Sequence, residues 1–127
     1  MDRWEALYNF WSSFGVPAYE ENSVPDLKTL TFPYITYQAS VSGWDEPLQI
    51  TASIWDENTS WSRVDGLSDT IEKAIRIADP VAYKSGMYRV WIGDTPFSQN
   101  MGDPDNDKIR RKVLTVMFEF MELTERS

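Results

Sequence analysis

The sequence predicts a single α+β domain over residues 1–127, with helices packed on one face of a four-stranded antiparallel or mixed sheet. Two observations lead to this fold class. Two segments repeat apolar residues every three or four positions, and four segments alternate apolar with polar residues. Their order along the chain is α-β-β-α-β-β. One antiparallel sheet with two helices on one face would bury the apolar residues of both the helices and the strands.

The first helix is expected over residues 2–14. Trp4, Leu7 and Trp11 recur at helical spacing, and a glycine followed by a proline ends the segment. We interpret this aromatic stripe as core rather than as a cofactor site. The next stretch, residues 16–33, contains several prolines and acidic residues and is expected to be an extended connection along the surface.

Two alternating segments follow, over residues 34–41 and 48–55. In each, apolar residues occupy every second position, which is typical of a half-buried strand. The short connection between them contains glycine and proline, with Trp44 at its tip. The two segments therefore predict an antiparallel hairpin.

A second helix, two further strands and a long loop complete the prediction. Residues 60–78 return to helical periodicity, and residues 87–92 and 109–123 alternate as strands. Residues 93–107 form a polar stretch longer than the usual connection in a compact domain. We expect this stretch to be a loop, mobile in an isolated subunit and ordered in an assembly; the alternative is a plain hairpin connection with Phe97 packed against its own domain.

Composition excludes several kinds of chemistry. The 127 residues contain neither cysteine nor histidine, so disulfide frameworks, thiolate zinc sites and histidine general bases are absent. The net charge of −8 would repel nucleic-acid phosphates and anionic lipid. Residues with apolar side chains make up 42% of the chain, but no run of them is long enough to span a membrane.

The carboxylate patterns do not predict a catalytic or metal site. Asp103, Asp105 and Asp107 have the spacing that opens a calcium-binding loop, but the following glycine and the final glutamate are missing. A solvated acidic loop is the favoured interpretation, and a weak cation site is the alternative. Glu119 and Glu122 would point to opposite faces of a strand and could not act together. We expect no catalytic, cofactor-binding or metal-binding residues.

Surplus apolar surface is the feature that points to function. The last predicted strand is apolar on both faces, although a sheet covered by helices on one side should be polar on the other. Tryptophan and methionine in such positions are typical of protein–protein interfaces; the alternative is that loops fold back over this face. The candidate interface residues are Trp44, Trp55, Trp91, Phe97, Met101, Arg110, Arg111, Met117 and Met121.

The chain resembles a family of small proteins from tailed bacteriophages and prophages, often labelled minor capsid or tail-completion (tail terminator) proteins. The resemblance extends over nearly the whole chain. It rests on the opening WEALYNFWSSFGVPAYEENSVP at positions 4–25, then PYITY at 33–37, ITASIW at 50–55, TSW at 59–61, VWI at 90–92 with TPF at 95–97 and DP at 103–104, and IRR at 109–111.

The resemblance implies a structural role in a virion. Tail terminators have a sheet flanked by helices, and they form a hexameric ring that caps the tail tube at its head-proximal end. The partners implied are further copies of the chain, the tail tube protein and the head–tail connector protein, with DNA only as passing cargo. No cofactor, membrane contact or catalytic residue is implied. Assembly would take place in the host bacterial cytoplasm.

Three other interpretations stay open at this stage. The chain could be another head–tail connector or a tail-tube-class subunit, since these relatives share its size and shape. It could also be a protein-interaction module unrelated to phage. A carboxylate enzyme is the third, although it would need convergent acids that the strand alternation does not provide.

Overall fold

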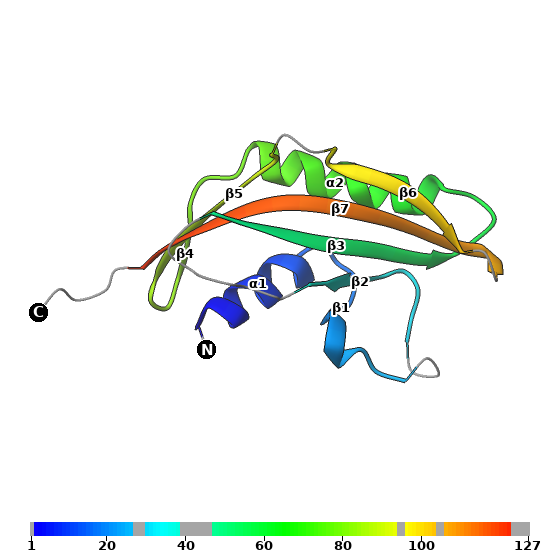
Figure 1. The fold of residues 1–127 in the computed structure, drawn as a ribbon, viewed down its shortest axis with the longest axis horizontal. Helices are drawn as coiled ribbons and strands as arrows, with labels where there is room; N and C mark the ends of the chain where they lie inside the picture. The colour runs from blue at the N-terminus through cyan, green and yellow to red at the C-terminus, as the bar shows by residue number, and fades with distance from the viewer. Residues whose placement is uncertain (1, 27–29, 39–46, 94–95, 104–105, 123–127) are drawn as a thin grey trace, which may run out of the picture.

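The computed structural model describes residues 2–26, 30–38, 47–93, 96–103 and 106–122. This part of the chain forms two α-helices and a curled sheet, so the α+β class is confirmed (Figure 1). In chain order the elements are α1 (Asp2–Ser12), β1 (Ala18–Glu20), the short 3-10 helix η1 (Glu21–Ser23), β2 (Tyr34–Tyr37), β3 (Leu48–Glu57), α2 (Ser62–Arg76), β4 (Val81–Tyr83), β5 (Gly86–Trp91), β6 (Ser98–Asp103) and β7 (Asn106–Glu122).

The long strand β7 is the centre of the sheet. The strand order is β1-β2-β3-β7-β5-β4, and β6 also pairs with β7. On one edge, β3 runs antiparallel to β7 from Leu48 opposite Phe118 to Glu57 opposite Ile109. On the other edge, β5 and β6 pair with successive parts of β7. Only β1 and β2, among the described strands, run parallel.

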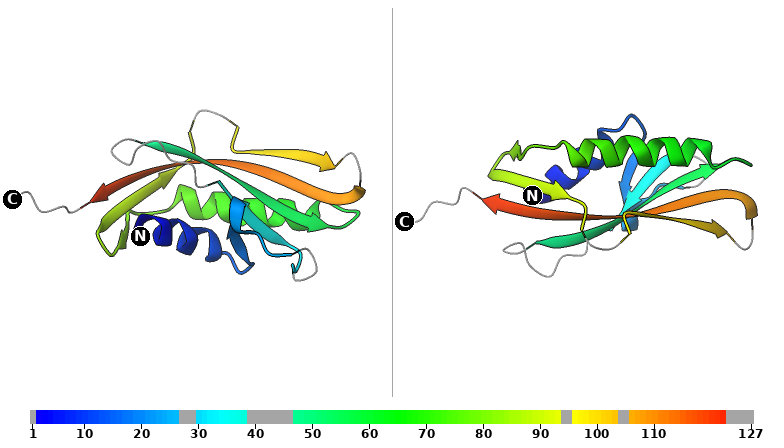
Figure 2. Two further views of the ribbon diagram at one scale, coloured as in Figure 1. Left: turned by 60° about the horizontal axis from the view of Figure 1, so that its bottom comes forward. Right: turned by 90° about the horizontal axis from the view of Figure 1, so that it is seen from above.

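Both helices lie on the same side of the sheet (Figure 2). We call this side the inner face and the opposite side the outer face. The helix α2 packs over β3, β5 and β7, and α1 packs near β1, β2 and β4. Trp11 of α1 and Ile71 of α2 are fully buried with Phe118 of β7 in the resulting core. The prediction that the helices cover one face is therefore correct.

The helix α1 ends at Ser12, two residues before its predicted end at residue 14. Gly15 has a φ of +85°, in the left-handed region that glycine adopts without a steric penalty. Just before it, the backbone N–H of Ser13 donates to the carbonyl oxygen of Phe10 over 3.2 Å and closes the last turn. This turn directs the chain back toward the sheet, where Ala18 pairs with Ile35.

The prediction of four strands is wrong, because the described chain contains seven. Two of the additional strands, β1 and β4, are three residues long, too short to show a periodic pattern. The strand β1 forms within the stretch that was expected to be an extended connection. It pairs beside β2, where the N–H of Ile35 donates to the carbonyl oxygen of Pro17 over 2.9 Å. The predicted element order therefore also needs correction.

The expected loop over residues 93–107 is largely a strand. Residues 98–103 form β6, which pairs antiparallel with β7 from Ser98 opposite Leu114 to Gly102 opposite Arg110. Its sequence, SQNMGD, is polar, so sequence periodicity does not reveal it. The unusually long β7 provides the partner edge that makes this segment a strand. Residues 94–95 and 104–105 lie outside the described residues.

Candidate interaction surface

The outer face of the sheet carries most of the residues predicted to form an interface. Residues directly opposite each other on neighbouring strands share a face, so the register assigns its members. They are Trp55 of β3, Arg111, Met117, Glu119 and Met121 of β7, Met87, Arg89 and Trp91 of β5, and Met101 of β6. No helix in the described part of the chain covers this face (Figure 2).

At one end of the outer face, Trp55 is held by three neighbours. Its ring stacks on that of Tyr34, with centroids 6.3 Å apart and planes 15° from parallel. Its indole N–H donates to the hydroxyl oxygen of Thr36 over 2.9 Å. The guanidinium of Arg111 lies 4.7 Å from the ring centroid, and its Nε donates to the hydroxyl oxygen of Ser53. Trp55 is therefore a fixed aromatic platform with a cation on its surface.

At the other end, Trp91 belongs to a second cation–aromatic pair. The guanidinium of Arg89 lies 4.9 Å from the Trp91 ring centroid and forms an ion pair of 2.6 Å with Glu119 on β7. Close packing continues beside it, because a Cβ added to Gly93 would lie 3.0 Å from the Met117 side chain. The absence of a side chain at Gly93 therefore lets the chain approach Met117 closely.

Exposed methionines lie on this face beside the aromatic platforms. Met87, Met121 and Met101 are 36%, 37% and 44% exposed, while Met117 is half-buried. Met87 and Met121 stand directly opposite each other on β5 and β7. Methionine is unbranched and adapts its shape to a partner, so it is well suited to a contact surface. The outer face combines apolar contact area with one exposed ion pair.

The remaining predicted interface residues lie elsewhere. Arg110 points to the inner side, where its guanidinium stacks on Trp61 at 5.3 Å and donates to the carbonyl oxygen of Thr59. Phe97 is half-buried and packs against the hydrophobic core. Trp44 falls outside the described residues. The structure therefore brings together Trp55, Trp91, Met101, Arg111, Met117 and Met121, but not Arg110.

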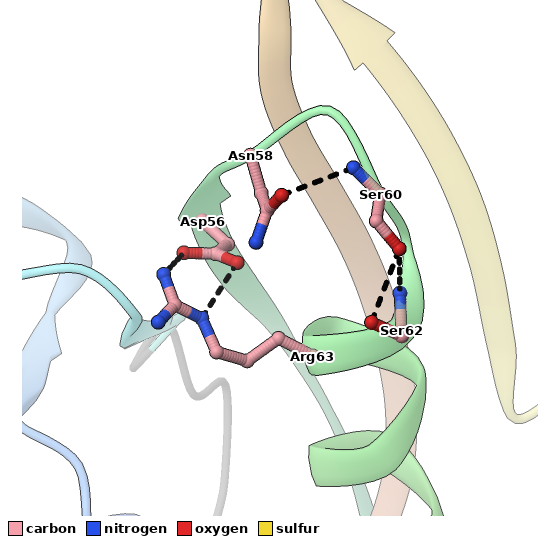
Figure 3. Close-up of polar contacts among 5 residues, drawn as sticks. All are labelled: Asp56, Asn58, Ser60, Ser62 and Arg63. Carbon is pink, nitrogen blue, oxygen red and sulfur yellow. Dashed lines mark hydrogen bonds and ion pairs between the residues drawn. The ribbon is translucent and has the colours of Figure 1, made fainter.

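Sequence reasoning missed the buried carboxylate of Asp56. Asp56 is fully buried at the end of β3, and both its oxygens accept hydrogen bonds from Arg63 of α2, one of them from Nε over 2.9 Å (Figure 3). The signal was present, because Asp56 continues the inward-facing alternation of Ile50, Ala52 and Ile54. An acidic residue at an inward position indicates a buried ion pair.

Asp56 has a structural rather than a catalytic environment. Between it and Arg63, the connection to α2 is closed by local hydrogen bonds: the N–H of Ser60 donates to the Asn58 side-chain oxygen, and the N–H of Ser62 donates to the Ser60 hydroxyl, both over 3.1 Å (Figure 3). The hydrogen bond to the Asp56 carboxylate raises the pKa of the Arg63 guanidinium above its usual value. This network fixes the start of α2 against the sheet.

Other titratable groups respond mainly to burial. Desolvation raises the pKa of Tyr88 to about 12 and, together with the charge of Glu20 and with Tyr8, that of Tyr37 to about 12. Both hydroxyls therefore stay protonated across the physiological range. In the described residues, no group of three or more acidic side chains is placed to hold a metal ion. The side chains of Asp103, Asp105 and Asp107 lie outside the described set.

Comparisons with known proteins leave the family open. No model of a protein family matches the sequence, and no curated protein matches it significantly. Neither described helix combines the length and apolar character that crossing a bilayer requires.

Proposed function

We propose that this chain is a structural subunit of a tailed phage or prophage particle. In this proposal it acts as tail terminators do, forming a hexameric ring at the head-proximal end of the tail. The ring would cap the tube, stop its polymerisation and present a surface to the head connector. No residue of the chain has a chemical role in this function, which depends on shape and contact area.

The outer face is the observation that carries the proposal. This face carries two tryptophans, each with an arginine guanidinium over its ring, and four methionines. The opposite face of the same sheet packs against the core. Interfaces are enriched in tryptophan, methionine and arginine at their centres. A specific contact needs about 800 Å² from each partner, and in this proposal the outer face supplies it.

The charge of the chain supports the same proposal. Six copies would together carry a net charge of −48, six times the −8 of one chain. A channel bounded by such subunits would repel the phosphate backbone and let DNA pass without binding it. A subunit that bound DNA tightly would need a positive net charge.

Charge insertion on the outer face tests whether it is a subunit contact. In the double variant Met87→Glu/Met121→Glu, two opposed exposed methionines become like charges on neighbouring strands. We expect the variant to keep the parent's circular dichroism but to lose any ring seen by light scattering and negative-stain imaging. The matched control is Ile77→Glu, an apolar-to-acidic change at an 81% exposed site just after α2.

Particle structures test the role itself. A ring of this protein at the head-proximal end of the tail is the expected result. Finished particles without such a ring would contradict the proposal, and a position along the tube would make the chain a tube-class subunit. Rings that survive the double methionine substitution would show that subunits meet through another surface.

A further inference from the structure

A groove lies between the C-terminal turn of α2 and the outer end of β5. It has a volume of about 570 Å³ and is open to solvent. Ile75 and Arg76 of α2 line one side, together with Ala78 and Pro80 of the connection to β4, and the consecutive residues 89–92 of β5 and its continuation line the other. Four consecutive residues along one wall mean that the groove follows the edge of a strand.

This part of β5 has an unpaired edge. The short strand β4 covers β5 only from Gly86 to Tyr88, and β7 occupies the opposite edge. The connection that precedes β4 leads back to α2, and its Ala78 and Pro80 line the groove without pairing with β5. Within the described residues, nothing pairs with β5 beyond Tyr88 on this side.

The backbone of Val90 faces the open edge. Tyr83 and Gly86 close a two-residue hairpin turn, so they form a hydrogen-bonded pair. In an antiparallel pair, every second residue directs its backbone N–H and C=O toward the same neighbouring strand. Along β5, Gly86 and Tyr88 direct theirs toward β4, and Val90 is the next residue in this series. Because β4 begins opposite Tyr88, the N–H and C=O of Val90 point into the groove. They form a ready template for a further strand.

The groove is basic in an acidic protein. Its lining includes Arg76 and Arg89 but no carboxylate, while the whole chain has a net charge of −8. Each arginine makes an exposed ion pair, with Glu72 and Glu119 respectively, and the two side chains are 61% and 52% exposed. Exposed pairs of this kind are weak and exchange partners readily. Arg76 and Arg89 at the groove therefore favour the binding of a segment with acidic side chains.

We propose that this groove binds an extended, acidic segment of a partner protein by strand addition to β5. The segment would exchange backbone hydrogen bonds with Val90, as an added strand does at an exposed sheet edge. An apolar residue opposite Val90 would contact Ile75 on the inner side, and an acidic neighbour would face Arg89 on the outer side. The site shares Arg89 and Trp91 with the outer face but lies along the edge of β5, and it does not depend on the particle role.

A second copy of this chain fits less well. Symmetric pairing of two β5 edges would gather Arg76 and Arg89 from both copies at one seam whose lining holds no carboxylate. Like charges on neighbouring strands are destabilising. An acidic segment from a partner protein would instead neutralise the positive charges of Arg76 and Arg89.

Capped peptides of alternating glutamate and valine are the probe. We expect the backbone amides of Val90 and Ile92 to shift in NMR spectra during titration at micromolar to millimolar concentration. At ten times the dissociation constant, hydrogen exchange at the Val90 amide should slow about tenfold, because only the free protein exchanges. N-methylation of the peptide's β5-facing amides should abolish binding, and methylation of the alternate amides should not.

Substitution of the two groove arginines tests whether their positive charges contribute to peptide binding. Arg76→Gln/Arg89→Gln should weaken binding of the glutamate peptide about fivefold, since each exposed pair contributes modestly. The matched control, Lys73→Gln/Lys108→Gln, removes two positive charges from residues outside the groove lining and should leave binding unchanged. Circular dichroism checks that both variants fold.

Three results would overturn the proposal. The first is the absence of any shift at Val90 at millimolar peptide. The second is equal binding of a lysine–valine peptide, which would remove the acidic preference. The third is a dimer whose formation protects the Val90 amide without peptide, which would assign the edge to a second copy.

Discussion

At the scale of single residues, Asp56 is the side chain whose environment matters most for stability. It is fully buried, and Arg63 binds both of its oxygens. Removing one partner of such a pair leaves a charge without compensation in the protein interior, which is far more damaging than losing an exposed pair. The Arg76–Glu72 pair on the same helix is exposed and provides the comparison.

We therefore predict that Arg63→Met destabilises the protein several times more than Arg76→Met. The exposed i,i+4 pair of Arg76 contributes about 0.5 kcal/mol or less. Urea unfolding at neutral pH measures both variants, and their circular dichroism before unfolding shows whether the fold is kept. Equal losses for the two variants would mean that the Asp56 carboxylate is not held by Arg63.

Tyr88 gives a prediction about alkaline pH. Burial raises its pKa from 10.0 to about 12, so the unfolded state releases this proton at a lower pH than the folded state. The stabilising effect of the raised pKa is complete below pH 10 and is lost as the pH rises toward 12. We expect the free energy of unfolding to fall across this window.

The Tyr88→Phe variant isolates that contribution, because it keeps the ring and removes the ionisable hydroxyl. Its stability should fall less steeply between pH 10 and 12 than that of the parent, as measured by urea unfolding at each pH. Parallel pH dependence in the two proteins would show that Tyr88 is not responsible. Ultraviolet absorbance of phenolate follows the titration directly.

At the scale of elements, β7 determines how the rest of the sheet is organised. Its 17 residues provide enough edge for β3 on one side and for both β5 and β6 on the other. The strand β6 is mostly polar, yet it is anchored at its start: the N–H of Thr115 donates to the carbonyl oxygen of Phe97 over 2.8 Å. The Phe97 ring packs against the core.

We predict that Phe97→Ala lowers the free energy of unfolding by about 2 kcal/mol, less than for a fully buried phenylalanine. Met101→Ala, at a more exposed position in β6, should stay within about 0.5 kcal/mol of the parent. Thermal and urea unfolding compare the two variants. If Phe97→Ala were neutral, residue 97 would belong to a loop rather than to the anchored start of a strand.

At the scale of the whole molecule, net charge sets the conditions for self-association. Each chain carries −8, so copies brought together repel one another at long range. Salt at 0.15 M screens exposed charges beyond about 8 Å and weakens that repulsion. The apolar contacts proposed for the outer face are not weakened by the same change.

We therefore predict that self-association strengthens as ionic strength rises from low to physiological salt. Sedimentation velocity at several protein concentrations measures it, and the Met87→Glu/Met121→Glu variant serves as the control that should stay dissociated. Association that weakens with salt would indicate instead that complementary charges hold the copies together.

Periodic sequence patterns determined the longer elements of this protein. The stripe of Trp4, Leu7 and Trp11 and the alternation through β3 and β7 predict two helices on one face of a sheet, which the structure confirms. The expectation that the whole stripe is core is wrong for Trp4, which is 38% exposed, whereas Leu7 and Trp11 are fully buried. Such patterns are local, because each residue's face follows from its spacing along one element. The same alternation predicts that Trp55 and Trp91 point away from the helices, as the register shows.

Only the tertiary structure decided the short strands and the buried polar groups. The strands β1, β4 and β6 form because a neighbouring strand offers an edge, and their own residues carry no period that reveals it. Three further features also depend on which segments meet in space. They are the placement of Arg110 and Arg111 against different tryptophans on opposite faces, the pairing of Asp56 with Arg63, and the open edge at Val90. Backbone pairing and ion pairing join residues that are distant in sequence, so spacing along the chain does not encode them.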